Sequence, residues 1–245
     1  MSLQPIDHIN GISSLIYVIV TILVGLTILM KYFKFGKRAF LFVGLTWIGM
    51  SEPWMPSGFS YLSNLIVGVG LPIEAYVIIG NVFAPLTNFF WFYAFTDLLY
   101  KEKQKLILAI IAIISVVFEI VFFTFLAIDP SLIGVWGEGS AVIHIDITYQ
   151  TVIMVYLLYI VATMLITGII FARNSLQSQV PEVNLKGKFL LVAFLAWCIG
   201  AILDSSIPLN VVTLPITRII LVSSALIFYI GYILPPGIKD IILSE

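Results

Sequence analysis

A succession of long apolar runs constrains this chain more than any other feature of its sequence. The clearest run, residues 106–128, contains Glu119 as its only charged residue. A helix needs about 20 apolar residues to cross the hydrocarbon core of a bilayer. Over the whole chain 61% of the residues are hydrophobic and 10% are charged, whereas about 25% of the residues of a soluble domain are charged. The sequence therefore predicts an integral membrane protein.

The runs predict an all-α, polytopic membrane protein: a seven-transmembrane-helix bundle that forms one domain over residues 1–245. The second span is the least regular, because Pro53 and Pro56 stand at its end and proline interrupts the hydrogen bonds of a helix. The next segment, residues 58–70, is expected either to lie at the membrane interface or to continue the second span. The expected spans are residues 10–30, 39–57, 72–99, 106–128, 146–171, 189–207 and 211–234.

The basic residues give the expected orientation. With seven crossings, every lysine and arginine except Arg218 falls on one side of the membrane, and the segment 129–145 falls on the other. Because cytoplasmic loops are enriched in lysine and arginine, we expect a multi-pass protein of the cell membrane with its N-terminus outside and its C-terminus in the cytoplasm. Trp54, Trp136 and Tyr61 are expected to anchor the outer membrane interface.

Composition excludes several kinds of chemistry. The formal net charge of −1 argues against a nucleic-acid partner, and the single cysteine, Cys198, excludes a disulfide framework. No lysine lies within an expected span, which excludes a retinal Schiff base, and the two histidines, His8 and His144, lie at the expected outer surface. We therefore expect no enzymatic activity, no cofactor and no metal site. The partner that the composition indicates is the lipid bilayer.

Two short sequence echoes suggest an internal duplication. "WIGMSEPWMP" at residues 47–56 is similar to "WCIGAILDSSIP" at residues 197–208, and "LPIE" at residues 71–74 is similar to "LPIT" at residues 214–217. Because the echoes come in the same order, spans one to three and five to seven are candidates for a 3+1+3 parallel repeat. Transporter sites commonly lie where such repeats meet. The alternative is coincidence among common apolar residues.

Charged residues inside the expected spans mark a candidate site. At 1.5 Å of rise per residue, Glu52, Glu119, Asp204 and Arg218 lie at a similar depth in the outer third of the bilayer. A charge at mid-membrane costs at least about 2.5–3.5 kcal/mol and usually faces the bundle interior. We therefore predict that Arg218 is buried and pairs first with Asp204, and second with Glu52 or Glu119. Asp204 is preferred because a short connection makes the last two spans antiparallel neighbours.

Further polar side chains extend this candidate site. Glu74, Asn81 and Asn88 recur every seven residues and should share one face of the third span, while Tyr149 and Tyr229 add hydroxyl groups to the fifth and seventh spans. The alternative is that such side chains only bond one helix to another. The expected ligand-binding residues are Glu52, Glu74, Asn81, Asn88, Glu119, Tyr149, Asp204, Arg218 and Tyr229.

Several segments resemble those of a known group of proteins. "DPSLIG" at residues 129–134, "TGIIFARNSLQS" at 167–178, "KGKFLLVAFLAWCIGAILD" at 186–204 and "FYIGYILPP" at 228–236 together resemble uncharacterised archaeal seven-transmembrane-helix proteins. That resemblance implies a fold and no function. The last segment is also similar to the end of the seven-helix sensor input region of some membrane histidine kinases.

Two functions fit a charged site inside a helix bundle. The first is a small-solute transporter, coupled to protons or cations, in which Glu52, Glu119 and Asp204 are candidate carriers. The second is a receptor-like or sensor module that binds an external small molecule or ion and signals through a partner protein. A purely structural scaffold is the third reading.

Overall fold

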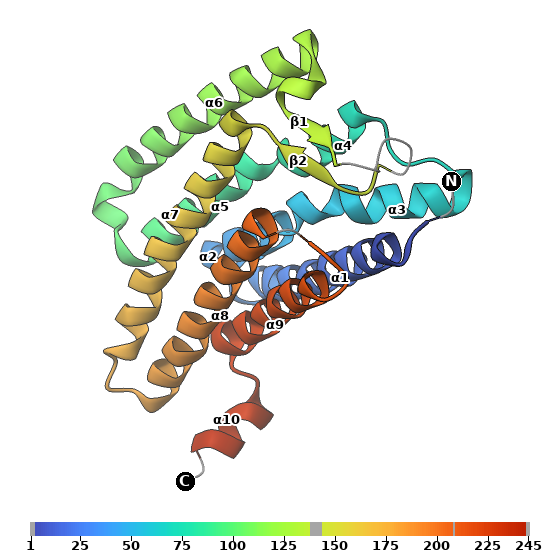
Figure 1. Cartoon of the computed structure of the whole chain (residues 1–245). Coiled ribbons are helices and arrows are strands. Elements are labelled where there is room, and N and C mark those ends of the chain that lie inside the picture. Colours follow the sequence, from blue (N-terminus) through green and yellow to red (C-terminus); the bar gives the residue numbers. More distant parts are fainter. Residues whose placement is uncertain (1–2, 138–143, 208, 244–245) are drawn as a thin grey trace.

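Long helices that lie side by side form the protein in the computed structural model, which describes residues 3–137, 144–207 and 209–243 (Figure 1). Within those residues, six helical segments are long and apolar enough to cross a membrane. This identifies a multi-pass helical membrane protein. The six segments are Pro5–Phe35, Ile73–Leu99, Lys101–Ile128, Thr151–Leu176, Pro181–Ser206 and Thr213–Ile233.

The second expected span is broken, as the prolines predicted. Helix α2 (Arg38–Gly49) ends before a 3₁₀ turn, η1 (Glu52–Trp54), and α3 (Met55–Val67) then follows. Both α2 and α3 pack along α1 (Pro5–Phe35), so the segment after the prolines continues as a helix. With 12 and 13 residues, α2 and α3 are each too short to cross a bilayer alone. A seventh crossing by the two together stays a prediction.

The third expected span, residues 72–99, is broken as well, which the sequence analysis did not anticipate. Helix α4 (Ile73–Asn81) ends at Val82, and α5 (Ala84–Leu99) begins again after Phe83. Proline fits only the first turn of a helix without loss of a hydrogen bond, and Pro85 stands in the first turn of α5. Two helix interruptions therefore lie in consecutive spans.

A short hairpin replaces the beginning of the fifth expected span. Strands β1 (Gly134–Trp136) and β2 (Ile147–Tyr149) pair antiparallel, with Gly134 opposite Tyr149. The prediction of a helix from residue 146 was wrong, because α7 (Thr151–Leu176) begins only after the hairpin. The alternation of polar and apolar residues over 146–149 is the strand pattern that was overlooked. Residues 138–143 of the expected outer segment 129–145 lie outside the described residues.

The remaining helices complete the bundle. The turn η2 (Lys101–Lys103) leads into α6 (Gln104–Ile128), the turn η3 (Pro130–Leu132) follows it, and α8 (Pro181–Ser206) packs along α9 (Thr213–Ile233). Helix α10 (Pro236–Leu243) extends beyond the bundle and contacts α8, and α1 begins and α10 ends at opposite ends of the molecule (Figure 1). Apolar side chains on α6, among them Ile113, Val116 and Ile120, are exposed, which suits contact with lipid.

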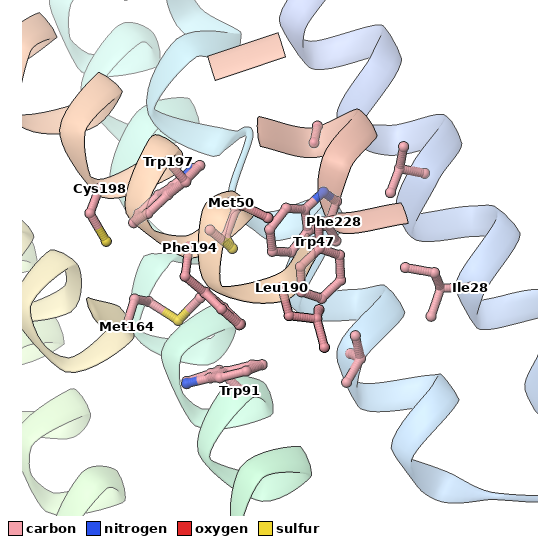
Figure 2. Packing of buried hydrophobic residues seen from close by; sticks show 14 of the residues in the cluster. Ile28, Trp47, Met50, Trp91, Met164, Leu190, Phe194, Trp197, Cys198 and Phe228 are labelled. Carbon is pink, nitrogen blue, oxygen red and sulfur yellow. The ribbon is translucent and has the colours of Figure 1, made fainter. Parts of the chain in front are cut away.

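Large aromatic rings fill the centre of the bundle (Figure 2). The rings of Trp47 on α2 and Phe228 on α9 stack with their centroids 3.7 Å apart. Phe194 on α8 meets Phe228 edge to face at 5.6 Å, and Trp91 on α5 lies 5.2 Å from Phe194. Because lipid is as apolar as these rings, close packing rather than escape from water holds such an interior together. We call these four rings the aromatic stack.

Glycines let neighbouring helices approach closely on either side of this stack. A Cβ added to Gly25 of α1 would lie 2.7 Å from the carbonyl oxygen of Gly44 of α2, and the reverse distance is also 2.7 Å. A Cβ on Gly231 of α9 would lie 2.9 Å from the backbone nitrogen of Leu190 of α8. Such contacts are typical of small-residue helix interfaces in membranes.

The internal repeat stays a prediction. The first echo, residues 47–56, contains the break between α2 and α3, whereas the helical part of the second echo is continuous to Ser206. Pro208, which ends the second echo, lies outside the described residues. The two echoes thus differ in local backbone structure over the part that the structure describes.

Candidate functional site

A cavity of about 320 Å³ opens at the end of the bundle where the β1–β2 hairpin and the end of α8 lie. Its walls come from α2, η1, α3, α4, α5, β2, α7, α8 and α9. This volume is at the lower end of the range for small-molecule sites. The charged residues that line it are Asp146, Asp204 and Arg218, and the aromatic residues are Trp54, Tyr76, Tyr149 and Trp197.

An ion pair between α8 and α9 forms one wall of the cavity. Nη1 of Arg218 donates to Oδ1 of Asp204 at 2.7 Å. The Arg218 side chain is 4% exposed and the Asp204 side chain is 16% exposed. The prediction that Arg218 is buried and pairs with Asp204 is confirmed. The pair forms because the short connection between α8 and α9 places their adjoining ends side by side.

Asp204 receives two further hydrogen bonds. Nε1 of Trp54 donates to Oδ2 at 2.8 Å, and Oγ1 of Thr217 lies 3.3 Å from Oδ1. Trp54 is 6% exposed, so its expected role as a membrane-interface anchor was wrong. The break between α2 and α3 turns this ring inward, where the ring of Tyr17 meets it edge-on at 4.9 Å.

Arg218 is held by a second helix as well. Its Nη2 donates to Oδ1 of Asn10 on α1 at 3.1 Å, and Ser14 donates to the same Asn10 oxygen at 3.2 Å. The guanidinium carbon lies 5.8 Å from the centre of the Trp54 ring. Nε of Arg218 has no hydrogen-bond partner among the described residues. Arg218 therefore joins α1, α8 and α9 around one charge.

Asp146, which the sequence analysis did not propose for this site, contributes a second carboxylate. It stands just before β2 and lines the cavity. Within the described residues, its carboxylate accepts one hydrogen bond, from the backbone N–H of Ile147 at 3.1 Å. The side chain is open to the cavity, yet the surrounding protein removes much of its bulk solvent. This loss of solvation, with a smaller effect of the nearby Asp204 carboxylate, raises the pKa of Asp146.

Glu52 and Glu119 neither pair with Arg218 nor line the cavity, and the common depth of the four charged residues stays a prediction. Oε1 of Glu52 accepts the backbone N–H of Phe83 at 2.6 Å, and the side chain is buried. Glu119 lies half-buried on α6, and its Oε2 has no hydrogen-bond partner among the described residues. Depth along a helix does not fix which way a side chain points around the helix axis.

The other predicted residues divide between the cavity and the helix contacts. Tyr149 lines the cavity, and its hydroxyl lies 3.2 Å from Nδ2 of Asn81. Asn88 accepts from Thr163 at 3.4 Å between α5 and α7. Glu74 is exposed outside the cavity. The predicted residues that do not line the cavity are Glu52, Glu74, Asn81, Asn88, Glu119 and Tyr229.

Among the charged and aromatic lining residues, four were not proposed for the site: Trp54, Tyr76, Asp146 and Trp197. The polar atoms of the three aromatic residues are bound within the protein. Nε1 of Trp197 donates to Tyr17 at 3.0 Å, and the Tyr76 hydroxyl donates to the carbonyl oxygen of Ile145 at 3.0 Å and lies 2.8 Å from Oγ of Ser57. The tryptophan in each sequence echo could have indicated a residue of the bundle centre, because Trp47 and Trp197 both lie there.

The described part of the chain brings together no three acidic, histidine or cysteine side chains that could hold a metal ion. Comparison of the chain with models of protein families, with curated proteins and with solved structures found no match. The site is therefore interpreted from its own geometry.

Proposed function

We propose that this membrane protein is a small transporter that takes a solute from the outer side into the cavity between the hairpin, α8 and α9. The observation that carries the proposal is that both helix breaks lie against the cavity. Gly49, Met50 and Pro53 line it from the first break, and Ala84 and Thr87 line it beside the second. Transporter sites are commonly built where membrane helices are discontinuous.

A carboxylate joins the two breaks. Glu52, in the first break, accepts the N–H of Phe83, which stands immediately before α5. The beginning of a helix carries a partial positive charge, so a carboxylate is stabilised there. Interrupted helices supply the few residues that absorb backbone rotation when a site opens and closes. The Glu52–Phe83 contact therefore couples two hinges beside one cavity.

The proposed orientation places the cavity at the outer face. The basic residues next to α1, α5, α7 and α9 stand at the ends of these helices remote from the hairpin, in agreement with a cytoplasmic location. The N-terminus is then outside and the C-terminus inside. Seven crossings, with α2 and α3 together forming one of them, satisfy this arrangement.

Uptake into proteoliposomes tests the proposal. The purified full chain is reconstituted, an outward-to-inward proton or sodium gradient is imposed, and internal accumulation of a mixture of small metabolites is measured by mass spectrometry. We expect at least one solute to accumulate above protein-free vesicles, and Arg218→Met to abolish that accumulation. Glu74→Gln, a change at an exposed outer residue, serves as the control. Equal solute content in loaded and protein-free vesicles would contradict transport.

A sensor remains the second candidate, because α9 connects the cavity to the cytoplasmic side directly. Arg218 lies near the beginning of α9, and α10 follows the end of the same helix after Leu234 and Pro235. Nζ of Lys239 on α10 lies 2.8 Å from Oε2 of Glu182 on α8. A sensor would change the labelling rate of a cysteine at position 239 when solute binds, without any uptake of solute into vesicles.

A further inference from the structure

The charge balance of the cavity distinguishes among possible solutes. Three charged side chains line the cavity, and two of them, Arg218 and Asp204, neutralise each other at 2.7 Å. The third, Asp146, accepts one hydrogen bond, from its own neighbour Ile147, within the described residues. The charge of the cavity is therefore that of one carboxylate, and the side chain that supplies it is free to meet a ligand.

The rest of the lining is aromatic and aliphatic. The donor groups of Trp54, Tyr76 and Trp197 are already bonded inside the protein, and the Tyr149 hydroxyl accepts a hydrogen bond from Asn81. Trp54, Tyr76 and Trp197 consequently offer a ligand their rings rather than their donors. Ring faces attract cations, by about 0.5–2 kcal/mol each depending on desolvation. Met154, Leu157 and Val161 of α7 add apolar surface.

We infer that the cavity binds a small organic monocation, with its ammonium group at the Asp146 carboxylate and its apolar part against the aromatic lining. This inference rests on the proposed function, since it takes the cavity to be the solute site. It names the class of solute and assigns Asp146 as the residue that selects it.

Two other classes of ligand fit the cavity less well. A metal ion needs several oxygen ligands, and the described residues offer one unpaired carboxylate against apolar walls. An anion would need Arg218, whose Nη1 and Nη2 are already bound to Asp204 and Asn10. It would also have to lie close to Asp146. A cation meets an unpaired charge of the opposite sign, and the pair Arg218–Asp204 need not open.

The groups around Asp146 agree with this assignment. Asp204, Arg218, Tyr76 and Tyr149 are the charged and titratable side chains that act on it electrostatically. Loss of solvation is the main influence on the carboxylate, and the same loss strengthens its attraction for a cation that enters the cavity. Any ammonium group meets the carboxylate by charge, and a primary ammonium group also supplies the hydrogen-bond donors that the carboxylate otherwise lacks.

The test measures ligand binding to the purified full chain in detergent. The readout is the temperature of thermal unfolding. Choline and phenethylammonium are the cationic probes, phenethyl alcohol is the neutral isostere, and phenylacetate is the anionic one. We expect both cations to raise the unfolding temperature in a saturable way, because a ligand that binds only the folded state stabilises it. The alcohol and the anion should have little effect at equal concentration.

Variants locate the cation. Asp146→Asn should weaken binding at least about tenfold, the equivalent of one charge-assisted hydrogen bond, whereas Asp146→Glu keeps the charge and should retain binding. Asn can still accept the N–H of Ile147, and the unliganded unfolding temperature reports whether each variant folds. Glu74→Gln changes the net charge equally at an exposed residue outside the cavity and should bind as the parent does.

Three results would overturn the inference: no stabilisation by either cation, equal stabilisation by the alcohol, or unchanged cation affinity of a folded Asp146→Asn variant. Its failure is distinguishable from that of the proposed function. Binding of phenylacetate instead of the cations would leave a solute site without the assigned selectivity. Cation binding that depends on Asp146, with no uptake into vesicles, would leave the inference standing and remove transport.

Discussion

Removal of Asp204 should destabilise the protein more than removal of Arg218, because the two side chains of this ion pair have different surroundings. In Asp204→Leu, Arg218 keeps the contact with Asn10, while Nη1 joins Nε without a partner. An arginine cannot lose its charge in a protein. Breaking a buried pair in this way costs about 3–5 kcal/mol, and we expect the free energy of unfolding of Asp204→Leu to fall by this amount.

Arg218→Met should be less damaging. Asp204 keeps the donors of Trp54 and Thr217, faces the cavity with 16% of its side chain exposed, and as an aspartate can bind a proton and become neutral. A loss of about 1–3 kcal/mol is expected for a polar group left partly satisfied. The double variant should lose less than Asp204→Leu alone, because it leaves no uncompensated charge.

The free energy of unfolding in a denaturing detergent is measured by tryptophan fluorescence for the four proteins of this cycle. These are the parent, Asp204→Leu, Arg218→Met and the double variant. The matched control is the exposed pair of Asp97 and Lys101 at the other end of the bundle, whose removal should change the free energy of unfolding by less than about 1 kcal/mol. If the losses in the two single variants add up in the double variant, or if Arg218→Met is the more damaging change, the reasoning from orphaned charge is wrong.

Further tests address the first break, the membrane topology and the acid of the cavity. Glu52→Leu removes the acceptor for the N–H of Phe83 and should lower the free energy of unfolding by about 1–3 kcal/mol. Glu52→Gln keeps a carbonyl acceptor, so equal losses in the two variants would contradict the contact. In a Cys198→Ala background, a membrane-impermeant reagent should label cysteine at position 135 from outside and at position 103 from the cytoplasm, and the reverse would refute the orientation. Binding of choline should weaken as the pH falls through the raised pKa of Asp146, because the carboxylate becomes neutral, and constant affinity down to pH values well below that pKa would contradict its role.

The sequence predicted the features that depend on local sequence patterns or on elements that are adjacent along the chain. The apolar runs identified the long helices, and the short link between the last two spans was enough to pair Arg218 with Asp204. Pro53 and Pro56 indicated the first helix break. In each case the signal was local, or it joined two elements that are neighbours along the chain.

The sequence could not predict what depends on rotation about helix axes and on breaks without a strong signal. Glu52 was predicted at the depth of Arg218, but its carboxylate contacts Phe83, because the break in which it stands changes the direction of the backbone. The interruption at Val82–Phe83 separates Asn88, on α5, from Glu74 and Asn81, which both lie on α4. Asp146 was predicted to be the first residue of the fifth span, whereas α7 begins only at Thr151. Its position in the cavity was therefore not predicted.

The aromatic stack has an electrical consequence. In the proposed orientation, water in the cavity brings the outer solution close to Trp47, Phe194 and Phe228, and the membrane voltage then falls mainly across the dry layer that these rings form. A net charge that crosses this layer experiences about 2.3 kcal/mol for each 100 mV of potential. Arg218 and Asp204, bound to each other in the wall of the cavity, carry no net charge as a pair and can shift together without responding to the voltage. An ion that leaves Asp146 for the cytoplasm would experience nearly all of it.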